Sequence, residues 1–119
     1  MKNVKILITI RDSDVAPRFD LTTEVLIVET DGNKATNKPR NILLPGPSAD
    51  ELCSLIIKEG VSLVICGGIE EAHYQYLVWK KITVIDKVIG PASEVLQRAM
   101  ANELGSGAIL RNSNREKRR

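Results

Sequence analysis

The apolar run at residues 4–10 (VKILITI) constrains the fold more than any other feature of this sequence. Only Lys5 and Thr9 interrupt its aliphatic residues, so the run predicts a central strand that is covered on both faces. Residues 61–66 (VSLVIC) predict a second buried strand. Strands of this kind need helices packed against the sheet that contains them.

The segments between and after these runs predict a β-hairpin followed by alternating helices and strands. Residues 24–30 predict a strand, Asp31-Gly32-Asn33 a turn, and residues 38–44 an antiparallel partner strand. Further along, the sequence predicts helices at residues 49–59, 69–79 and 91–104 and a short strand at residues 82–85. We therefore expect an α/β domain with a mixed sheet, whose ligands bind at the carboxyl ends of the strands.

Length and composition are those of one small domain with its own core. The chain has 119 residues, of which 43% are hydrophobic and 27% are charged. No apolar run approaches the ~20 residues that cross a bilayer, so we expect no membrane association. Two cysteines, Cys53 and Cys66, are too few for a disulfide framework, which favours a reducing cytoplasm as the location.

The positive charge of the chain is concentrated at its C-terminus. Residues 111–119 contain five basic residues and one acidic residue, a net +4, so the rest of the chain carries −2 of the total of +2. We expect residues 1–104 to form the domain and residues 105–119 to be a flexible basic tail. A solvated tail is the simpler interpretation, and binding to nucleic acid, an acidic partner or a membrane surface is the alternative.

The run Cys66-Gly67-Gly68-Ile69 is the most informative one for chemistry. A thiol at the end of a buried strand is followed by two glycines and by the predicted start of a helix. The N–H groups of a helix N-terminus favour anions and lower the pKa of a nearby thiol. The run suggests soft-metal ligation, anion binding or a reactive thiol. The alternative is a small buried cysteine followed by a tight turn.

The helix predicted at residues 69–79 contains His73, the only histidine of the chain. A helical wheel predicts an inward face consisting of Ile69, Ala72, His73, Tyr76, Leu77 and Trp79. His73 could then share a cavity with Cys66, or it could be a buried histidine bonded to the backbone. Tyr74 and Val78 fall on the opposite face and would mark a partner surface.

Other potential ligands have simpler interpretations. Cys53 lies within a predicted helix and is expected to pack in the core, and no spacing typical of a zinc site occurs. Asp12, Asp14 and Asp20 could bind a hard cation, although a solvated loop explains them equally. The sequence contains no phosphate-binding, dinucleotide-binding or nucleophile-elbow motif, so we do not expect an enzyme.

Several of these segments resemble one known family. The opening strand, the loop that ends in Pro17-Arg18-Phe19, and residues 64–69 (VICGGI) resemble the dinitrogenase iron–molybdenum cofactor-binding family, which includes NifX-like proteins and the C-terminal domain of NifB. Val84-Ile85-Asp86 and the last helix fit the same pattern. The resemblance covers residues 4–104 and implies a ribonuclease H-like three-layer α/β fold with a mixed five-stranded sheet.

The resemblance also implies a function. Such a protein binds, carries or helps to assemble an iron–sulfur or molybdenum–iron–sulfur cluster, as a nitrogenase accessory that receives it from a donor protein or passes it to an acceptor. A preassembled cluster brings its own sulfides, so Cys66 and His73 would suffice as its metal ligands. Phe19 would shield the site, and the segment Gly67–Ile69 would approach the cluster with its backbone N–H groups.

Alternatives to this function stay open. Family members commonly have Gly-Pro where this chain has Glu70-Glu71, and two acidic residues repel an anionic ligand. A metal-free interaction or regulatory module would use Tyr74, Val78 and the tail, and a cluster could also bridge two chains of a homo-oligomer. We do not expect binding to nucleic acid, because nucleases of this fold need an acid on the first strand and residues 4–10 contain none.

Overall fold

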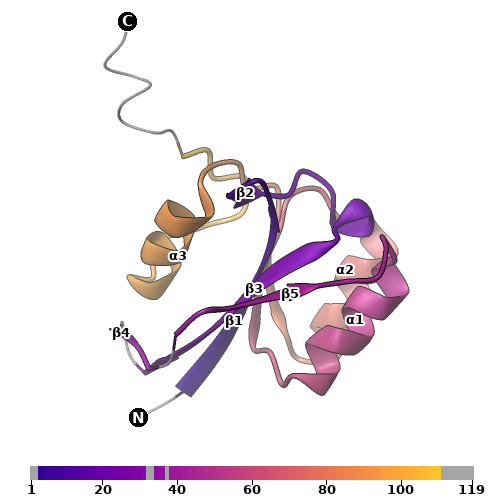
Figure 1. Cartoon of the computed structure of the whole chain (residues 1–119), viewed down its shortest axis with the longest axis horizontal. Coiled ribbons are helices and arrows are strands. Elements are labelled where there is room, and N and C mark those ends of the chain that lie inside the picture. The colour runs from indigo at the N-terminus through magenta and orange to yellow at the C-terminus, as the bar shows by residue number, and fades with distance from the viewer. Residues whose placement is uncertain (1–2, 32–33, 37, 111–119) are drawn as a thin grey trace, which may run out of the picture.

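The computed structural model describes residues 3–31, 34–36 and 38–110 and contains one mixed sheet with helices on both faces (Figure 1). Its elements in chain order are β1 (Asn3–Arg11), β2 (Asp14–Val15), the 3-10 helix η1 (Phe19–Leu21), β3 (Glu24–Asp31), β4 (Lys34–Ala35), β5 (Arg40–Leu43), α1 (Ala49–Lys58), β6 (Leu63–Ile65), α2 (Glu71–Trp79), β7 (Thr83–Ile85) and α3 (Ala92–Met100). The α/β class expected from the sequence is confirmed.

β1 is the central strand of the sheet. It pairs antiparallel with β3 on one side and parallel with β6 on the other, and β7 continues the sheet in parallel beyond β6. Every residue from Ile6 to Ile10 is buried, as the apolar run predicts. Because β1, β6 and β7 run in the same direction, their carboxyl ends meet at one edge of the sheet.

The sheet differs from the expected five strands by two very short additions. The five longer strands, β1, β3, β5, β6 and β7, are the predicted ones; with β2 and β4, of two residues each, the described part of the chain has seven. β2 lies where a loop was predicted. It pairs with the end of β1 through a tight turn in which Asp12 and Ser13 both have positive φ, 53° and 76°. This conformation is the one that two-residue hairpin turns require.

The helices cover the two faces of the sheet and give three layers. α1 and α2 lie together on one face and α3 lies on the other (Figure 1). A hydrophobic core under α1 and α2 contains Leu7, Leu52, Val64 and Leu77, and a second core under α3 contains Ile8, Ile65 and Val95. Among the described residues no helix is long and apolar enough to cross a membrane.

Two helix boundaries predicted from the sequence are wrong. α2 begins at Glu71 rather than at Ile69, because Gly68 pairs with Arg18 in a β-bridge and Glu70 is still extended, with φ −70° and ψ 149°. α3 ends at Met100 rather than near Leu104. Asn102 adopts a left-handed φ of 60° there, and its N–H donates to the carbonyl of Ala99. A left-handed residue of this kind terminates a helix.

The inward face of α2 is also different from the predicted one. Leu77 is the fully buried residue of α2, whereas Trp79 is 72% exposed and Tyr76 is 39% exposed. Tyr74, expected on a partner surface, instead packs against the core under α1 and α2. The predicted wheel assumed that the helix starts at residue 69. Ile69 lies outside the observed helix, and the side of α2 that faces the core is the one with Tyr74 and Leu77.

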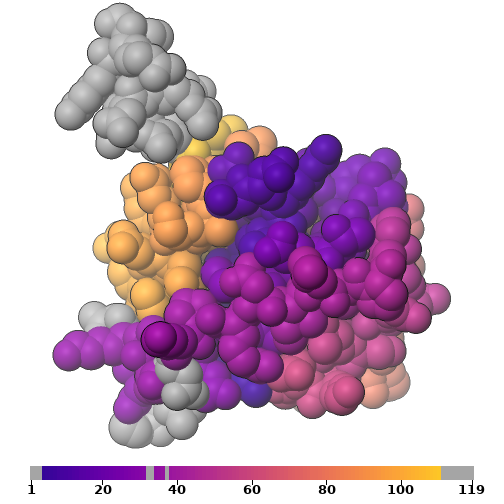
Figure 2. All heavy atoms as spheres, viewed as in Figure 1, coloured from indigo at the N-terminus to yellow at the C-terminus, as the bar shows by residue number. Residues whose placement is uncertain are grey.

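The first residues of the predicted tail lie against the domain. Ile89 donates its N–H to the carbonyl of Ala108 at 2.9 Å, and Leu110 donates to the carbonyl of Ile89 at 2.7 Å. Figure 2 shows this segment and the residues around α3, in orange and yellow, beside the indigo residues of the β1–β2 hairpin. Residues 105–110 are therefore held by backbone pairing, and the basic residues 111–119 lie outside the described residues.

Candidate functional site

The loops that follow β1, β6 and β7 contain most of the residues that the sequence singles out. The β1–β2 turn and residues 16–19 follow the first strand, Cys66 and the two glycines follow the second, and residues 86–91 follow the third. Backbone hydrogen bonds join these loops. Val88 donates to the carbonyl of Cys66 at 3.1 Å, and Lys87 donates to that of Gly67 at 2.9 Å.

Cys66 lies in the core and has no exposed surface. Burial raises the pKa of its thiol to about 12, and the negative charge of Asp86 adds to the same effect. The expected lowering of this pKa by a helix N-terminus is therefore wrong, because α2 starts five residues later and desolvation dominates. A thiol with no exposed surface is not accessible to a metal in this conformation.

Gly67 and Gly68 allow the loop at residues 16–19 to pack closely against the segment after β6. A Cβ atom on Gly67 would lie 2.5 Å from the carbonyl oxygen of Pro17 and would also collide with that of Ala16. Gly68 donates its N–H to the carbonyl of Pro17, and its own carbonyl accepts from Phe19, both at 2.8 Å. The close backbone approach predicted for these glycines exists, and in the structure the partner is the loop at residues 16–19.

Phe19 and Ile69 complete this cover over Cys66. Phe19 is 1% exposed and belongs to the same core cluster as Cys66, and its ring centroid lies 6.0 Å from that of His73. Ile69 is partly buried and packs against the cluster. Phe19 thus lies in the core on the α1–α2 side of the sheet, and its role as a shield of the site stays a prediction.

Thr9 is a buried polar residue that the sequence did not mark as functional. Its side chain is fully buried, and its hydroxyl oxygen has no hydrogen-bond partner among the described residues. The parallel register pairs Ile8 with Ile65, so one residue further along Thr9 lies beside Cys66. Alternation along β1 places Thr9 on the same face as Leu7, which belongs to the cluster that contains Cys66.

His73 does not share a pocket with Cys66. It lines a pocket of about 340 Å³ between α1 and α2, together with Asp50, Cys53, Ser54 and Tyr76. Nε2 of His73 lies 3.9 Å from a carboxylate oxygen of Glu70, and the side chain is 23% exposed. Cys53 packs in the core, as predicted, and also lines this pocket. Burial raises the pKa of its thiol to about 11, and the negative charge of Asp50 adds to the same effect.

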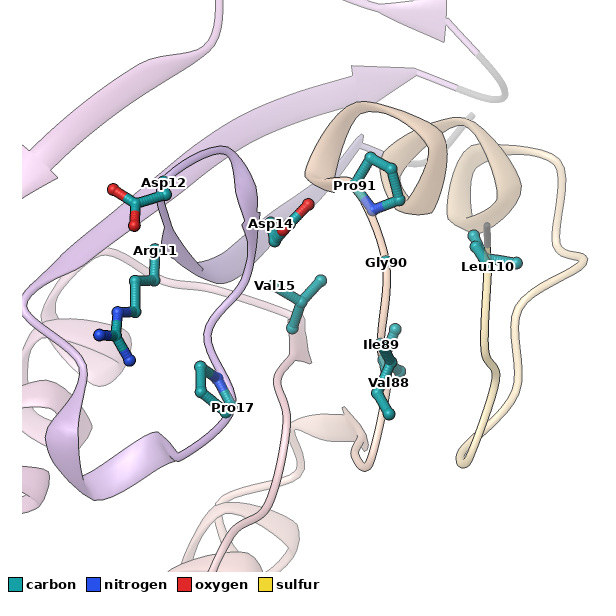
Figure 3. A pocket seen from close by; sticks show the side chains of 10 residues that line it. All are labelled: Arg11, Asp12, Asp14, Val15, Pro17, Val88, Ile89, Gly90, Pro91 and Leu110. Carbon is teal, nitrogen blue, oxygen red and sulfur yellow. The ribbon is translucent and has the colours of Figure 1, made fainter. Parts of the chain in front are cut away.

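A second pocket lies at the β1–β2 turn. Its volume is about 440 Å³, and Figure 3 shows Arg11, Asp12 and Asp14 on one side, the segment Val88–Pro91 facing them, and Leu110 beyond it. The two carboxylates outnumber the single guanidinium, so the polar wall of this pocket has a net negative charge. Asp20, the third acid of the loop, is instead paired with Arg18 at 2.7 Å, which lowers the pKa of Asp20.

The described residues contain no group of three or more His, Cys, Asp or Glu side chains that could hold one metal ion. A conventional closed metal site would need such a group. The side chains that could bind a soft metal are thus a covered thiol, Cys66, and the pair Cys53 and His73 between the two helices. Only the second arrangement is open to a ligand.

Comparison with known proteins extends these observations. The chain matches the family model described as dinitrogenase iron-molybdenum cofactor over residues 2–102. No curated protein matches it significantly.

Solved structures share the fold. PH0822 has a TM-score of 0.79 at 21% identity, over 87% of this chain and 94% of that chain. A Methanocaldococcus jannaschii protein provisionally assigned as a dinitrogenase has a TM-score of 0.70 at 25% identity, over 88% and 95% of the two chains. A Thermotoga protein provisionally assigned as NifB, of the DUF35 family, has a TM-score of 0.67 at 14% identity, over 87% and 92%.

Proposed function

Because the chain belongs to the dinitrogenase iron-molybdenum cofactor family, we propose that it is an accessory protein that handles a metallocluster. It binds, carries or helps to assemble an iron–sulfur or molybdenum–iron–sulfur cluster and catalyses no reaction on it. The cluster is cargo, received from a donor protein and passed to an acceptor. The single observation that carries the proposal is the family match, which spans nearly the whole domain.

The side chains of the domain are compatible with this role. A preassembled cluster supplies its own bridging sulfides, so a carrier needs few terminal ligands, in agreement with the lack of a three-ligand group among the described residues. The chain offers two free thiols and one imidazole. Free thiols of this kind persist in a reducing compartment, which supports a cytoplasmic location.

Cys66 fits the role of principal ligand only under one condition. Its thiol is fully buried, and the loop at residues 16–19 lies over it through the bonds between Gly68, Pro17 and Phe19. A cluster reaches this thiol only after that loop moves away. In this role Cys66 would bind a cluster only in a conformation of the domain in which the loop at residues 16–19 has moved, and not in the conformation of the structure.

The proposal predicts that the protein takes up iron and sulfide. After anaerobic reconstitution with ferrous iron, sulfide and molybdate, we expect stoichiometric metal and a visible absorption band from sulfide-to-iron charge transfer. Metal and sulfide analysis of the desalted protein measures the uptake. The Glu103→Gln variant, changed at an exposed position after α3 and so on the other face of the sheet from Cys53 and His73, should take up the same amount. A colourless, metal-free product under these conditions would rule the proposal out.

A second candidate function is a metal-free interaction module. The observation in its favour is the exposed end of α2, where Trp79 is 72% and Val78 is 44% exposed. Nζ of Lys80 lies 5.0 Å from the centroid of the Trp79 ring, so the indole is held partly against its own helix. In this alternative, the exposed end of α2 would pair with a second copy of the chain.

The two functions make different predictions for Trp79→Ser. If α2 forms a dimer contact, sedimentation should show a concentration-dependent dimer for the unmodified protein and a monomer for the variant. If cluster handling is the function, the variant should keep its full iron content and its sedimentation behaviour, because Trp79 lies outside the pocket that contains Cys53 and His73. Loss of iron uptake in Trp79→Ser would contradict this placement.

A further inference from the structure

The pocket between α1 and α2 brings the only imidazole of the chain and a thiol to one place. It is lined by Cys53 and Ser54 from α1 and by His73 and Tyr76 from α2, with Asp50 at the start of α1. Both helices lie on the same face of the sheet and contact each other. The pocket is a product of this packing and joins residues that are 20 positions apart in the sequence.

We infer that this pocket is the attachment site of an iron–sulfur core, with Cys53 and His73 as its two protein ligands. The inference rests on the proposed function and assigns it a place and a class of cargo. Thiolate and imidazole are both established types of ligand for iron in clusters. Ser54 and Tyr76 add hydroxyl groups that can donate hydrogen bonds to the sulfides of the core.

The arrangement around His73 suits a metal ligand. Nε2 of the ring lies 3.9 Å from a carboxylate oxygen of Glu70, and in the proposed site Nδ1 is the nitrogen that binds the metal. A ligating histidine commonly has a carboxylate at its second nitrogen, because this fixes the ring and raises its basicity. On its other side the ring contacts Phe19, which is itself buried and limits the motion of His73.

Access separates this site from the buried thiol at the end of β6. Cys66 has no exposed surface, and the loop at residues 16–19 would have to leave before any ligand arrived. Cys53 is 6% exposed and lines a pocket of about 340 Å³. This volume is in the range of small-ligand pockets. A ligand in this pocket would therefore meet Cys53, whereas Cys66 has no exposed surface.

The charge around the pocket selects the class of cargo. Asp50 and Glu51 lie in the first turn of α1, and Glu70 and Glu71 lie at the start of α2. Neither lysine nor arginine is among the residues that line the pocket. Such surroundings repel strongly anionic cargo, so among metalloclusters they favour a small iron–sulfur core of low negative charge.

The test uses a matched pair of cysteine variants. The full chain and its Cys53→Ala, Cys66→Ala and His73→Gln variants are reconstituted anaerobically with ferrous iron and sulfide, and the iron retained after desalting is measured. We expect full retention in Cys66→Ala and about tenfold less or lower in Cys53→Ala. His73→Gln should reduce retention and shift the absorption spectrum. Thermal unfolding of each variant shows whether it is folded.

Each outcome gives a decision. If Cys66→Ala loses the iron after desalting and Cys53→Ala keeps it, the proposed site is wrong. The proposed function would still stand, because the unmodified protein binds a cluster. If no protein retains a cluster, the proposed function fails, and titration with cadmium ion tests the pocket by itself. A thiolate-to-cadmium absorption band in the unmodified chain that is lost in Cys53→Ala and weakened in His73→Gln supports the site. The absence of that band, or its survival in Cys53→Ala, overturns it.

Discussion

A Gly67→Ala variant is expected to lose about 3 kcal/mol of unfolding free energy. The added methyl group would lie 2.5 Å from the carbonyl oxygen of Pro17 and would also collide with the carbonyl of Ala16. Both obstacles are backbone atoms, so no side-chain rotation relieves them. The carbonyl of Gly67 also accepts from Lys87, so a shift here disturbs the loops after β1, β6 and β7 together. Urea denaturation measures the loss.

Gly68→Ala is the matched control for this prediction. A Cβ atom on Gly68 would lie 3.5 Å from the carbonyl oxygen of Pro17, which is an ordinary van der Waals contact. We expect this variant to unfold within about 1 kcal/mol of the unmodified protein. Equal losses in the two variants would mean that the glycines matter for backbone freedom and not for the close approach of the loop at residues 16–19.

The sheet was predictable from the sequence because its strands are apolar in a characteristic way. The run at residues 4–10 predicted that β1 is central. The predicted start of α1 was correct because Ser48 caps the helix, with its hydroxyl accepting from the N–H of Glu51 at 3.2 Å. The bridge between Arg18 and Gly68 was not predictable, because it joins loops 50 residues apart through backbone atoms. That bridge is what delays the start of α2.

The candidate site was predictable only in part. The wheel for residues 69–79 correctly turned His73 inward, but it did not show which helix lies opposite. One signal was available. The crossovers that add β6 and β7 proceed in the same direction across the sheet, and right-handed crossovers then place α1 and α2 on one face. Applied to the sequence, this rule would have brought His73 toward Cys53 rather than toward Cys66.

The pKa of Cys66 shows why charge arguments from sequence failed there. A thiol before two glycines and a helix was expected to ionise easily. In the structure burial in the core removes water from the thiol and raises the pKa of Cys66 to about 12. Desolvation depends on contacts between distant segments, which local sequence does not show. The state of this thiol therefore depends on the cover and not on the helix.

Removal of that cover should have the second large effect. Phe19→Ala is expected to destabilise the domain by about 3–5 kcal/mol, because a fully buried ring is replaced by a cavity. Leu21→Ala, in the same 3-10 helix but at a position that is 56% exposed, should stay within about 0.5 kcal/mol of the unmodified protein. Urea denaturation of both variants measures the difference. Similar values for the two would contradict the burial of Phe19.

The same Phe19→Ala variant should make Cys66 reactive. Water entering the cavity lowers the pKa of the thiol from about 12 toward its ordinary value, so at pH 8 a larger fraction is thiolate and alkylation by iodoacetamide is faster. Peptide mapping by mass spectrometry distinguishes Cys66 from Cys53. Leu52→Ala removes another fully buried side chain and controls for global unfolding. If alkylation of Cys66 accelerates equally in both variants, unfolding and not the cover controls this thiol.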